Sequence, residues 1–167
     1  MEIQKIICLD LDGVLNVIPQ GHDEFGSIFH SNFVDNLKHI IDETGAKIVI
    51  SSTWRMNGIL EMKRMWEVRG LPGEVIDITP TCYQMVDWGK FERYDEVERG
   101  YEIQDWLDKH PEVTNYVILD DDNDMLDSQR DNFVRCANNT DHEDCVDIGY
   151  GLTKQCAEQA ITILKKK

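Results

Sequence analysis

The chain has 167 residues, of which 41% are hydrophobic and 29% charged; this is enough apolar material for the core of one ordinary domain and too much for a disordered chain. Its 32 acidic and 17 basic residues give a formal net charge of −15, which argues against tight binding to duplex nucleic acid or to an anionic membrane surface. A small anion held through a metal ion is compatible with this charge, because the ion supplies positive charge.

Nothing in the sequence predicts secretion or a membrane span. The first apolar run, residues 6–9, is too short for a signal peptide, and no stretch approaches the roughly 20 apolar residues of a spanning helix. The cysteines are odd in number, scattered and without a CxxC pair, which is typical of reduced thiols; they are Cys8, Cys82, Cys136, Cys145 and Cys156. We therefore predict a cytoplasmic protein that does not contact the membrane.

The first half of the chain alternates between the apolar patterns of strands and of helices. Residues 3–9 form a short, nearly continuous apolar run, which predicts a strand buried on both faces. Residues 31–44 carry apolar side chains at helical spacing, and residues 47–50 predict a second buried strand. A helix at residues 57–69 and a third strand at residues 75–78 follow.

The second half continues the same alternation. Helical spacing predicts a helix over residues 100–110, which Pro111 ends. A fourth buried strand is predicted at residues 116–119 and an edge strand at residues 133–136. Thr153 is expected to cap a last helix.

This alternation predicts an α/β fold of the Rossmann-like type, with three α/β/α layers and a central parallel sheet. The two longer stretches without a predicted element, residues 17–30 and 79–99, are too short for a large cap domain. We predict a single domain over residues 1–167, with its ligand site beyond the carboxyl ends of the strands.

Polar side chains follow three of the predicted strands. Asp10 and Asp12 follow the first, and Ser51 follows the second. Asp120 and Asp121 begin an acidic run after the fourth. Because these strand ends share one edge of a parallel sheet, at least four carboxylates are expected to converge, and like charges at such distances raise one another's pKa. A hard divalent cation with oxygen ligands relieves this repulsion, and Mg²⁺ is the usual one beside phosphate.

These residues carry a resemblance to a known superfamily. The sequence ICLDLDGVL at residues 7–15 resembles the first motif of the haloacid-dehalogenase (HAD) superfamily, an apolar strand followed by Asp-x-Asp-Gly. Ser51, after the apolar residues 48–50, resembles its second motif. Asp120 and Asp121, after the apolar residues 117–119, resemble its acidic fourth motif.

Three further segments resemble a narrower branch, the small capless HAD domains of Swiss-army-knife RNA-repair proteins and of phage and bacterial stand-alone proteins. They are ISSTWR at residues 50–55, RGYEIQDWL at residues 99–107 and GLT at residues 151–153. Together, the resemblances cover nearly the whole chain in the expected order.

The resemblance implies catalytic roles for the first two motifs. Asp10 is expected to attack phosphorus and form an aspartyl-phosphate, and Asp12 to protonate the leaving oxygen and later activate water. Dehalogenase-type members lack an acid at the position of Asp12, so this residue favours hydrolysis of a phosphate ester. Gly13 is expected to turn the backbone so that amide N–H groups face the phosphate, and Ser51 to hydrogen-bond a phosphoryl oxygen.

The resemblance also implies a Mg²⁺ site. Its expected ligands are Asp10, Asp120, Asp121 and the backbone carbonyl of Asp12. Asp124 is left with three interpretations: a direct ligand, a group behind the ligands or a helix cap.

The resemblance also implies a basic residue beside the phosphate, just before the helix that leads to the fourth predicted strand. Lys90, Arg93 and Arg99 all qualify by position. We favour Arg99, because it directly precedes the helix, and we assign Arg93 to substrate binding.

Three residues after the second strand have more than one interpretation. Ser52 is a candidate for binding substrate or a residue that simply ends the strand. Arg55 is a candidate for contacting substrate, or for pairing with an internal carboxylate. Trp54 is expected in the core.

The functional prediction is a Mg²⁺-dependent phosphohydrolase that acts on a phosphomonoester, either a nucleotide or the terminal phosphate of a nucleic acid. Two alternatives stay open: a nucleotide-sequestering protein with little turnover, and a phosphotransferase. The expected partner is a small phosphorylated substrate or a nucleic-acid end, without tight duplex binding. The sequence does not predict an oligomeric state.

Overall fold

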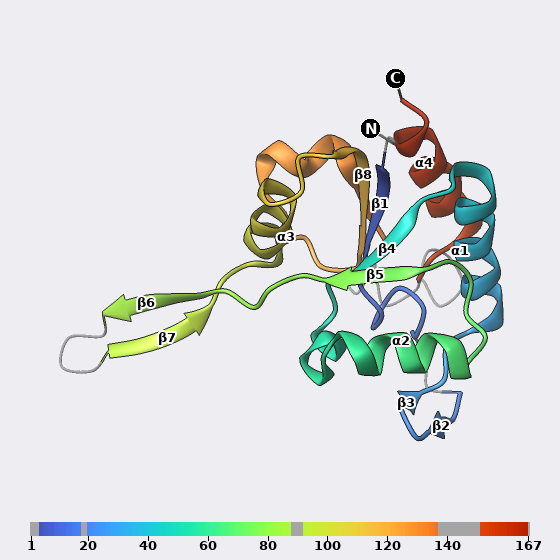
Figure 1. Ribbon diagram of the computed structural model, residues 1–167, viewed down its shortest axis with the longest axis horizontal. Coiled ribbons are helices and arrows are strands. Elements are labelled where there is room, and N and C mark those ends of the chain that lie inside the picture. Colours follow the sequence, from blue (N-terminus) through green and yellow to red (C-terminus); the bar gives the residue numbers. More distant parts are fainter. Residues whose placement is uncertain (1–3, 18–19, 88–91, 137–150, 167) are drawn as a thin grey trace, which may run out of the picture.

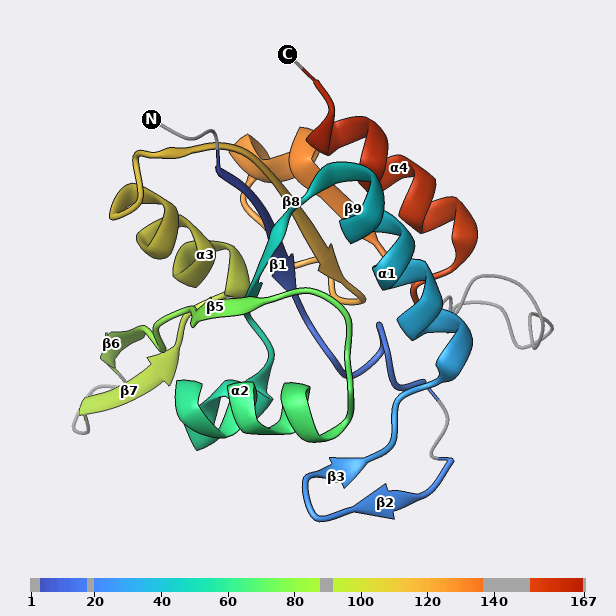
Figure 2. The same cartoon turned by 45° about the vertical axis from the view of Figure 1, so that its right-hand side comes forward.

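The computed structural model describes residues 4–17, 20–87, 92–136 and 151–166, with the backbone alone for residues 84–87 and 92–95. Its centre is a five-stranded sheet in the order β5-β4-β1-β8-β9, in which every neighbouring pair is parallel. Figures 1 and 2 show these strands, which are β1 (Gln4–Leu9), β4 (Lys47–Ile50), β5 (Val75–Ile78), β8 (Val113–Asp120) and β9 (Phe133–Arg135).

The chain reverses its direction of travel across the sheet at β1. It moves outward from β1 through β4 to β5, and then crosses back to pair β8 with the other side of β1. Ligands of such sheets bind beyond the carboxyl ends of the strands at this switch point. The ends of β1, β4 and β8 are therefore the place to look for a site.

Helices cover both faces of the sheet (Figures 1 and 2). Because successive side chains of a strand point to opposite faces, Ile7 and Leu9 of β1 join the core with α1 (Ser31–Thr44) and α4 (Lys154–Leu164). Ile6 and Cys8 of β1 pack instead against α3 (Arg99–Asp108). The prediction of three α/β/α layers around a parallel sheet is confirmed.

The remaining helix, α2 (Ile59–Val68), begins two residues later than the predicted helix at residues 57–69. Residues Thr53–Asn57 form a separate 3-10 turn, η1, and Gly58 lies between the two with φ of 88°, a backbone conformation that glycine adopts readily. Apolar spacing predicted the helix, but it did not mark the glycine that separates it from η1.

The prediction that residues 79–99 lack regular structure was wrong. They contain β6 (Tyr83–Asp87) and β7 (Glu92–Glu96), which form an antiparallel hairpin extending away from the three layers in Figure 1. Neither strand carries a continuous apolar run, which is the pattern that marked the strands of the central sheet. The shorter segment, residues 17–30, includes a second small hairpin of β2 (His22–Asp23) and β3 (Gly26–Ser27).

Two further expectations concern the membrane and the cysteines. In the part of the chain that the structure describes, every helix is too short or too polar to span a bilayer. Cys8, Cys82, Cys136 and Cys156 are free thiols. Cys145 lies outside the described residues.

Two helical leucines test where the core lies. Leu37 of α1 is fully buried, whereas Leu60 of α2 is 82% exposed. We expect Leu37→Ala to lower the free energy of unfolding by about 2–5 kcal/mol, because it leaves a cavity in the core. The matched change Leu60→Ala is expected to shift it by no more than about 0.5 kcal/mol. Urea denaturation measures both, and equal effects would contradict the assigned core.

Candidate active site

The loops at the carboxyl edge of the sheet continue its hydrogen-bond ladder. Asp10 follows β1 directly, and its N–H donates to the carbonyl of Leu119 at 2.9 Å. Ser51 follows β4, and its N–H donates to the carbonyl of Leu9 at 3.0 Å. Asp120 is the last residue of β8. The parallel register thus brings the three predicted motifs to one place.

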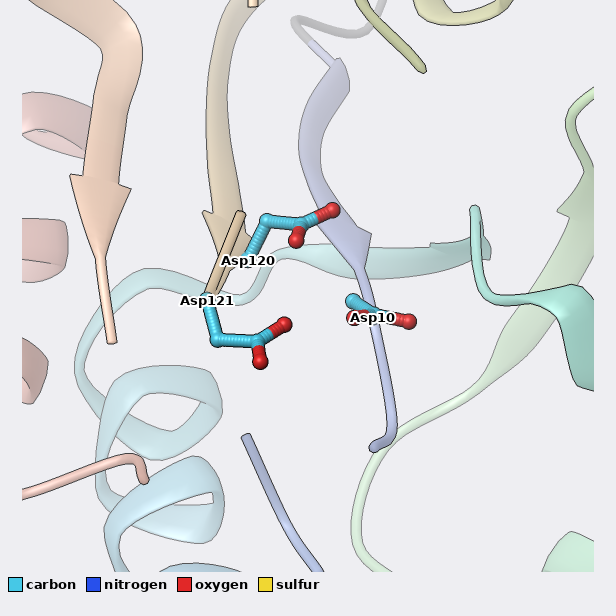
Figure 3. Close-up of side chains that lie close together, drawn as sticks. All are labelled: Asp10, Asp120 and Asp121. Carbon is cyan, nitrogen blue, oxygen red and sulfur yellow. The ribbon is translucent and has the colours of Figure 1, made fainter. Parts of the chain in front are cut away.

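Three carboxylates face one another at this edge (Figure 3). Asp10, Asp120 and Asp121 each offer an oxygen, and these atoms all lie within 4.8 Å of one another. Burial raises the pKa of Asp10 to about 7, although the positive charge of Arg99 lowers it. Burial, followed by the charge of Asp10, raises the pKa of Asp120 to about 9. The three groups therefore resist simultaneous ionisation without added positive charge.

The donor set of this cluster fits a divalent cation. All of its ligands are carboxylate oxygens, which Mg²⁺ and Ca²⁺ prefer. Asp120 Oδ1 accepts the N–H of Asp122 at 2.9 Å, whereas Asp120 Oδ2 is buried and has no hydrogen-bond partner among the described residues. A buried carboxylate oxygen without a partner is costly, and a bound cation would satisfy it.

The side chain of Asp12 is exposed and is not a member of this three-carboxylate cluster. Asn16 Nδ2 donates to its Oδ1 at 3.1 Å, and Trp54 Nε1 donates to its Oδ2 at 2.9 Å. Trp54 is half-buried and packs against the core as expected, but no sequence pattern predicted that its N–H reaches Asp12. Asp12 is therefore held beside the acidic cluster as a separate group.

Gly13 is required by a close contact as well as by its backbone. Its φ is 80°, a conformation that glycine adopts more readily than other residues. A Cβ at this position would lie 2.1 Å from Asp121 Oδ2, inside the volume of that carboxylate. Any larger residue would displace Asp121 from the cluster.

The two serines after β4 are both fully buried but have different surroundings. Ser52 Oγ accepts the N–H of Trp54 at 3.3 Å and also hydrogen-bonds the carboxylate of Asp10, which lowers the pKa of Asp10. Ser51 Oγ has no hydrogen-bond partner within the described part of the chain. Ser51 is therefore the hydroxyl available to a ligand, and Ser52 supports Asp10.

Arg55 does not have a donor to offer to substrate. Its side chain is 5% exposed, and Arg55 Nη2 donates to Glu102 Oε2 at 2.7 Å. Nη1 donates to the carbonyls of Ser51 and Ser52, and Nε to that of Thr79. The assignment of Arg55 to substrate binding is therefore corrected: it pairs with an internal carboxylate, the other interpretation of its sequence context, and fixes the backbone of both serines.

Among the three candidate cations, the structure places Arg99 beside the cluster. Its charge lowers the pKa of both Asp10 and Asp120, and Arg99 Nη1 is buried without a partner among the described residues. Lys90 lies outside the described residues. Arg93 lies in β7, opposite Val86, with only its backbone described.

Asp124 caps the helix that carries Arg99. Its Oδ2 accepts the backbone N–H of Arg99 at 3.0 Å, and its carbonyl accepts the N–H of Gly100 at 3.2 Å. A carboxylate at a helix N-terminus satisfies free N–H groups and suits the positive end of the helix dipole. Asp124 Oδ2 therefore acts as a helix cap. Asp124 Oδ1 is buried without a hydrogen-bond partner among the described residues, but Asp124 is not a member of the three-carboxylate cluster.

Comparison with protein families gives a match over most of the chain. The family described as the HAD domain in Swiss Army Knife RNA repair proteins matches residues 6–141. The chain belongs to this family. No curated protein and no solved structure matches this chain significantly.

Membership confirms the resemblance on which the site was predicted. The matched residues of this HAD domain include the carboxyl ends of β1, β4 and β8, which carry the acidic cluster and Ser51, whereas α4 lies beyond the match. The family indicates phosphohydrolase-type chemistry, and the acidic cluster is suited to hold a metal ion.

The acidic cluster predicts how the stability of the metal-free protein depends on pH. Each of these carboxyl groups has a higher pKa in the folded protein than in the unfolded chain, where the pKa is near 4. Its contribution to stability is therefore fully present below about pH 4. That contribution is lost as the pH rises through the folded pKa values of about 7 for Asp10 and about 9 for Asp120. In EDTA, the free energy of unfolding is expected to fall between about pH 6 and about pH 9, at up to about 1.4 kcal/mol per pH unit for each proton. Excess Mg²⁺ should reverse the loss.

Urea denaturation at several pH values, with EDTA or Mg²⁺, measures this effect. Asp120→Asn is the matched control, since it removes a titrating group and should flatten the dependence in EDTA. Stability that stays constant or rises across this range in EDTA would contradict the electrostatic interpretation of the cluster.

The buried ion pair of Arg55 and Glu102 gives a second prediction. Arg55→Met leaves Glu102 buried without its partner and is expected to lower the free energy of unfolding by about 3–5 kcal/mol. The double variant Arg55→Met/Glu102→Leu should recover part of this loss. Arg130→Met, in a pair with Asp127 whose side chains are 79% and 96% exposed, should cost at most about 1 kcal/mol. Equal losses for the two single arginine variants would refute the assigned role.

Proposed function

We propose that this HAD domain is a Mg²⁺-dependent phosphohydrolase that cleaves a phosphomonoester through an aspartyl-phosphate on Asp10. The observation that carries the proposal is the convergence of Asp10, Asp120 and Asp121 at the switch point of the sheet, within a family of HAD domains. Ser51 and Arg99, each with a buried polar atom that lacks a partner among the described residues, complete a site for an anion.

In the first step, a carboxylate oxygen of Asp10 attacks phosphorus while the bond from phosphorus to the leaving oxygen breaks. Asp12 gives its proton to that oxygen, so the product leaves as an alcohol. Ser51 Oγ donates a hydrogen bond to a phosphoryl oxygen, and the guanidinium of Arg99 balances the negative charge. The cluster of Asp10, Asp120 and Asp121 would hold Mg²⁺, which supplies further positive charge to the phosphoryl oxygens when bound.

In the second step, Asp12 accepts a proton from water as the water oxygen attacks phosphorus. The bond between Asp10 and phosphorus breaks, which releases inorganic phosphate and restores the carboxylate of Asp10. Asp12 thereby regains the proton that it gave up in the first step, and the cycle balances.

We propose a nucleotide or the terminal phosphate of a nucleic acid as the substrate. The description of the family as a domain of RNA repair proteins supports this class. Among the described residues, the segments inserted after β1 and β5 form the small hairpins β2–β3 and β6–β7 and no larger domain, which favours a site open to the end of a larger molecule. The net charge of −15 disfavours a long contact with a polyanion, so recognition is centred on the terminal phosphate.

Phosphate release tests the proposal. The purified protein is assayed with Mg²⁺ on nucleotides, 3′- and 5′-phosphorylated oligonucleotides and an aryl phosphate. We expect release that EDTA abolishes and that Asp10→Asn lowers by about 10³-fold or more, because the nucleophile is lost. Asp127→Asn, at a side chain that is 96% exposed and does not belong to the cluster, is the matched control and should retain wild-type activity.

The outcomes separate the proposal from its alternatives. Absence of release from every substrate by a folded, Mg²⁺-loaded protein would overturn it and favour a nucleotide-sequestering protein. Transfer of the phosphoryl group to an added alcohol in preference to water would instead identify a phosphotransferase.

A further inference from the structure

The carboxylate of Asp12 is held on both of its oxygens, by side chains from different parts of the chain. Asn16 Nδ2 reaches Oδ1 at 3.1 Å from the same turn, and Trp54 Nε1 reaches Oδ2 at 2.9 Å from η1, after β4. An exposed aspartate on a tight turn otherwise samples several rotamers. The contact with Trp54 fixes this side chain to the rigid end of the sheet.

Trp54 is itself held in place by several contacts. The backbone N–H of Trp54 donates to Ser52 Oγ at 3.3 Å, and the centroid of its indole lies 5.6 Å from that of the Phe29 ring. The guanidinium of Arg69 lies over the indole at 5.7 Å from its centroid. A Cβ at Gly26 would come within 3.2 Å of the indole, so the β2–β3 hairpin closes on its edge. Trp54 therefore has little freedom to move away from Asp12.

We propose that Trp54 is a positioning residue that orients Asp12 for proton transfer to the leaving group. This inference rests on the proposed function, because it assigns to Asp12 the transfer of that proton. Trp54 touches neither phosphate nor metal in this scheme, and it acts through the carboxylate that its N–H contacts. General acid catalysis depends on such placement, since a misdirected donor loses much of its effect.

A positioning role predicts a dependence on the leaving group that a structural role does not. An ester whose leaving group is a stabilised anion, such as p-nitrophenyl phosphate, needs little proton donation, whereas an alkyl phosphate needs it fully. Trp54→Phe keeps an aromatic ring but removes the N–H. It is expected to lower kcat/KM by about 10- to 100-fold for the alkyl ester and by less than about 3-fold for p-nitrophenyl phosphate.

The experiment measures kcat/KM for p-nitrophenyl, phenyl and alkyl phosphates with Mg²⁺. Wild type, Asp12→Asn and Trp54→Phe are compared, with Trp54→Leu as a second variant whose side chain has no hydrogen-bond donor. Trp106→Phe is the matched control: Trp106 Nε1 donates to Asp77 Oδ2 at 2.7 Å, the same kind of bond away from the acidic cluster. Trp106→Phe should leave the leaving-group dependence unchanged.

A steeper dependence on the leaving group in Asp12→Asn and in both Trp54 variants supports the inference. An equal loss for all esters in the Trp54 variants, or no loss, would overturn it while leaving the phosphohydrolase proposal intact. Absence of turnover by the wild type would overturn the proposed function first, and the role of Trp54 with it.

Discussion

Repulsion among Asp10, Asp120 and Asp121 is the constraint around which this site is organised. The parallel register of β1 and β8 brings these carboxylates together, with Asp10 only 7% exposed and Asp120 only 1% exposed. Such a cluster persists only if its surroundings supply positive charge or a proton. Arg99 provides one positive charge, and the carboxylate oxygens are suited to bind a divalent cation that would provide the rest. Gly13 makes the geometry possible, because the space of its missing side chain contains the carboxylate of Asp121.

A second buried interaction connects the loop after β4, which carries the two serines, to α3, which carries Arg99. The Arg55–Glu102 pair joins the loop after β4 to α3, which begins at Arg99. Through its bonds to the carbonyls of Ser51 and Ser52, Arg55 holds the serines in place, and Glu102 lies one turn along the helix from Arg99. Because a buried charge is costly without its partner, the Arg55–Glu102 pair holds the loop that carries Ser51 against the helix that carries Arg99.

The fold alone does not specify the chemistry, because Rossmann-like sheets support many functions. The structure gives the two aspartates of one motif different surroundings. Asp10 is buried within the acidic cluster, whereas Asp12 is exposed and held by Asn16 and Trp54. The same short segment thus presents one carboxylate suited to a nucleophile beside a metal and another suited to proton transfer.

The sequence by itself determined the layers of the fold and the acidic cluster. Both depend on local patterns: apolar runs of strand length, helical spacing, and aspartates directly after β1 and β8. Those patterns predicted the parallel sheet, and with it the meeting of Asp10, Asp120 and Asp121. They predicted less well the β6–β7 hairpin, whose strands carry no continuous apolar run.

Only the tertiary structure decided the partners of the residues around that cluster. Arg55 and Glu102 are 47 positions apart, and Trp54 and Asp12 are 42 apart, so no local pattern relates them. Asp124 became a cap for α3 because packing brings it to Arg99 across 25 residues. Hydrophobic periodicity shows which face of an element is buried, but the choice of polar partner depends on distances that exist only once the layers have packed.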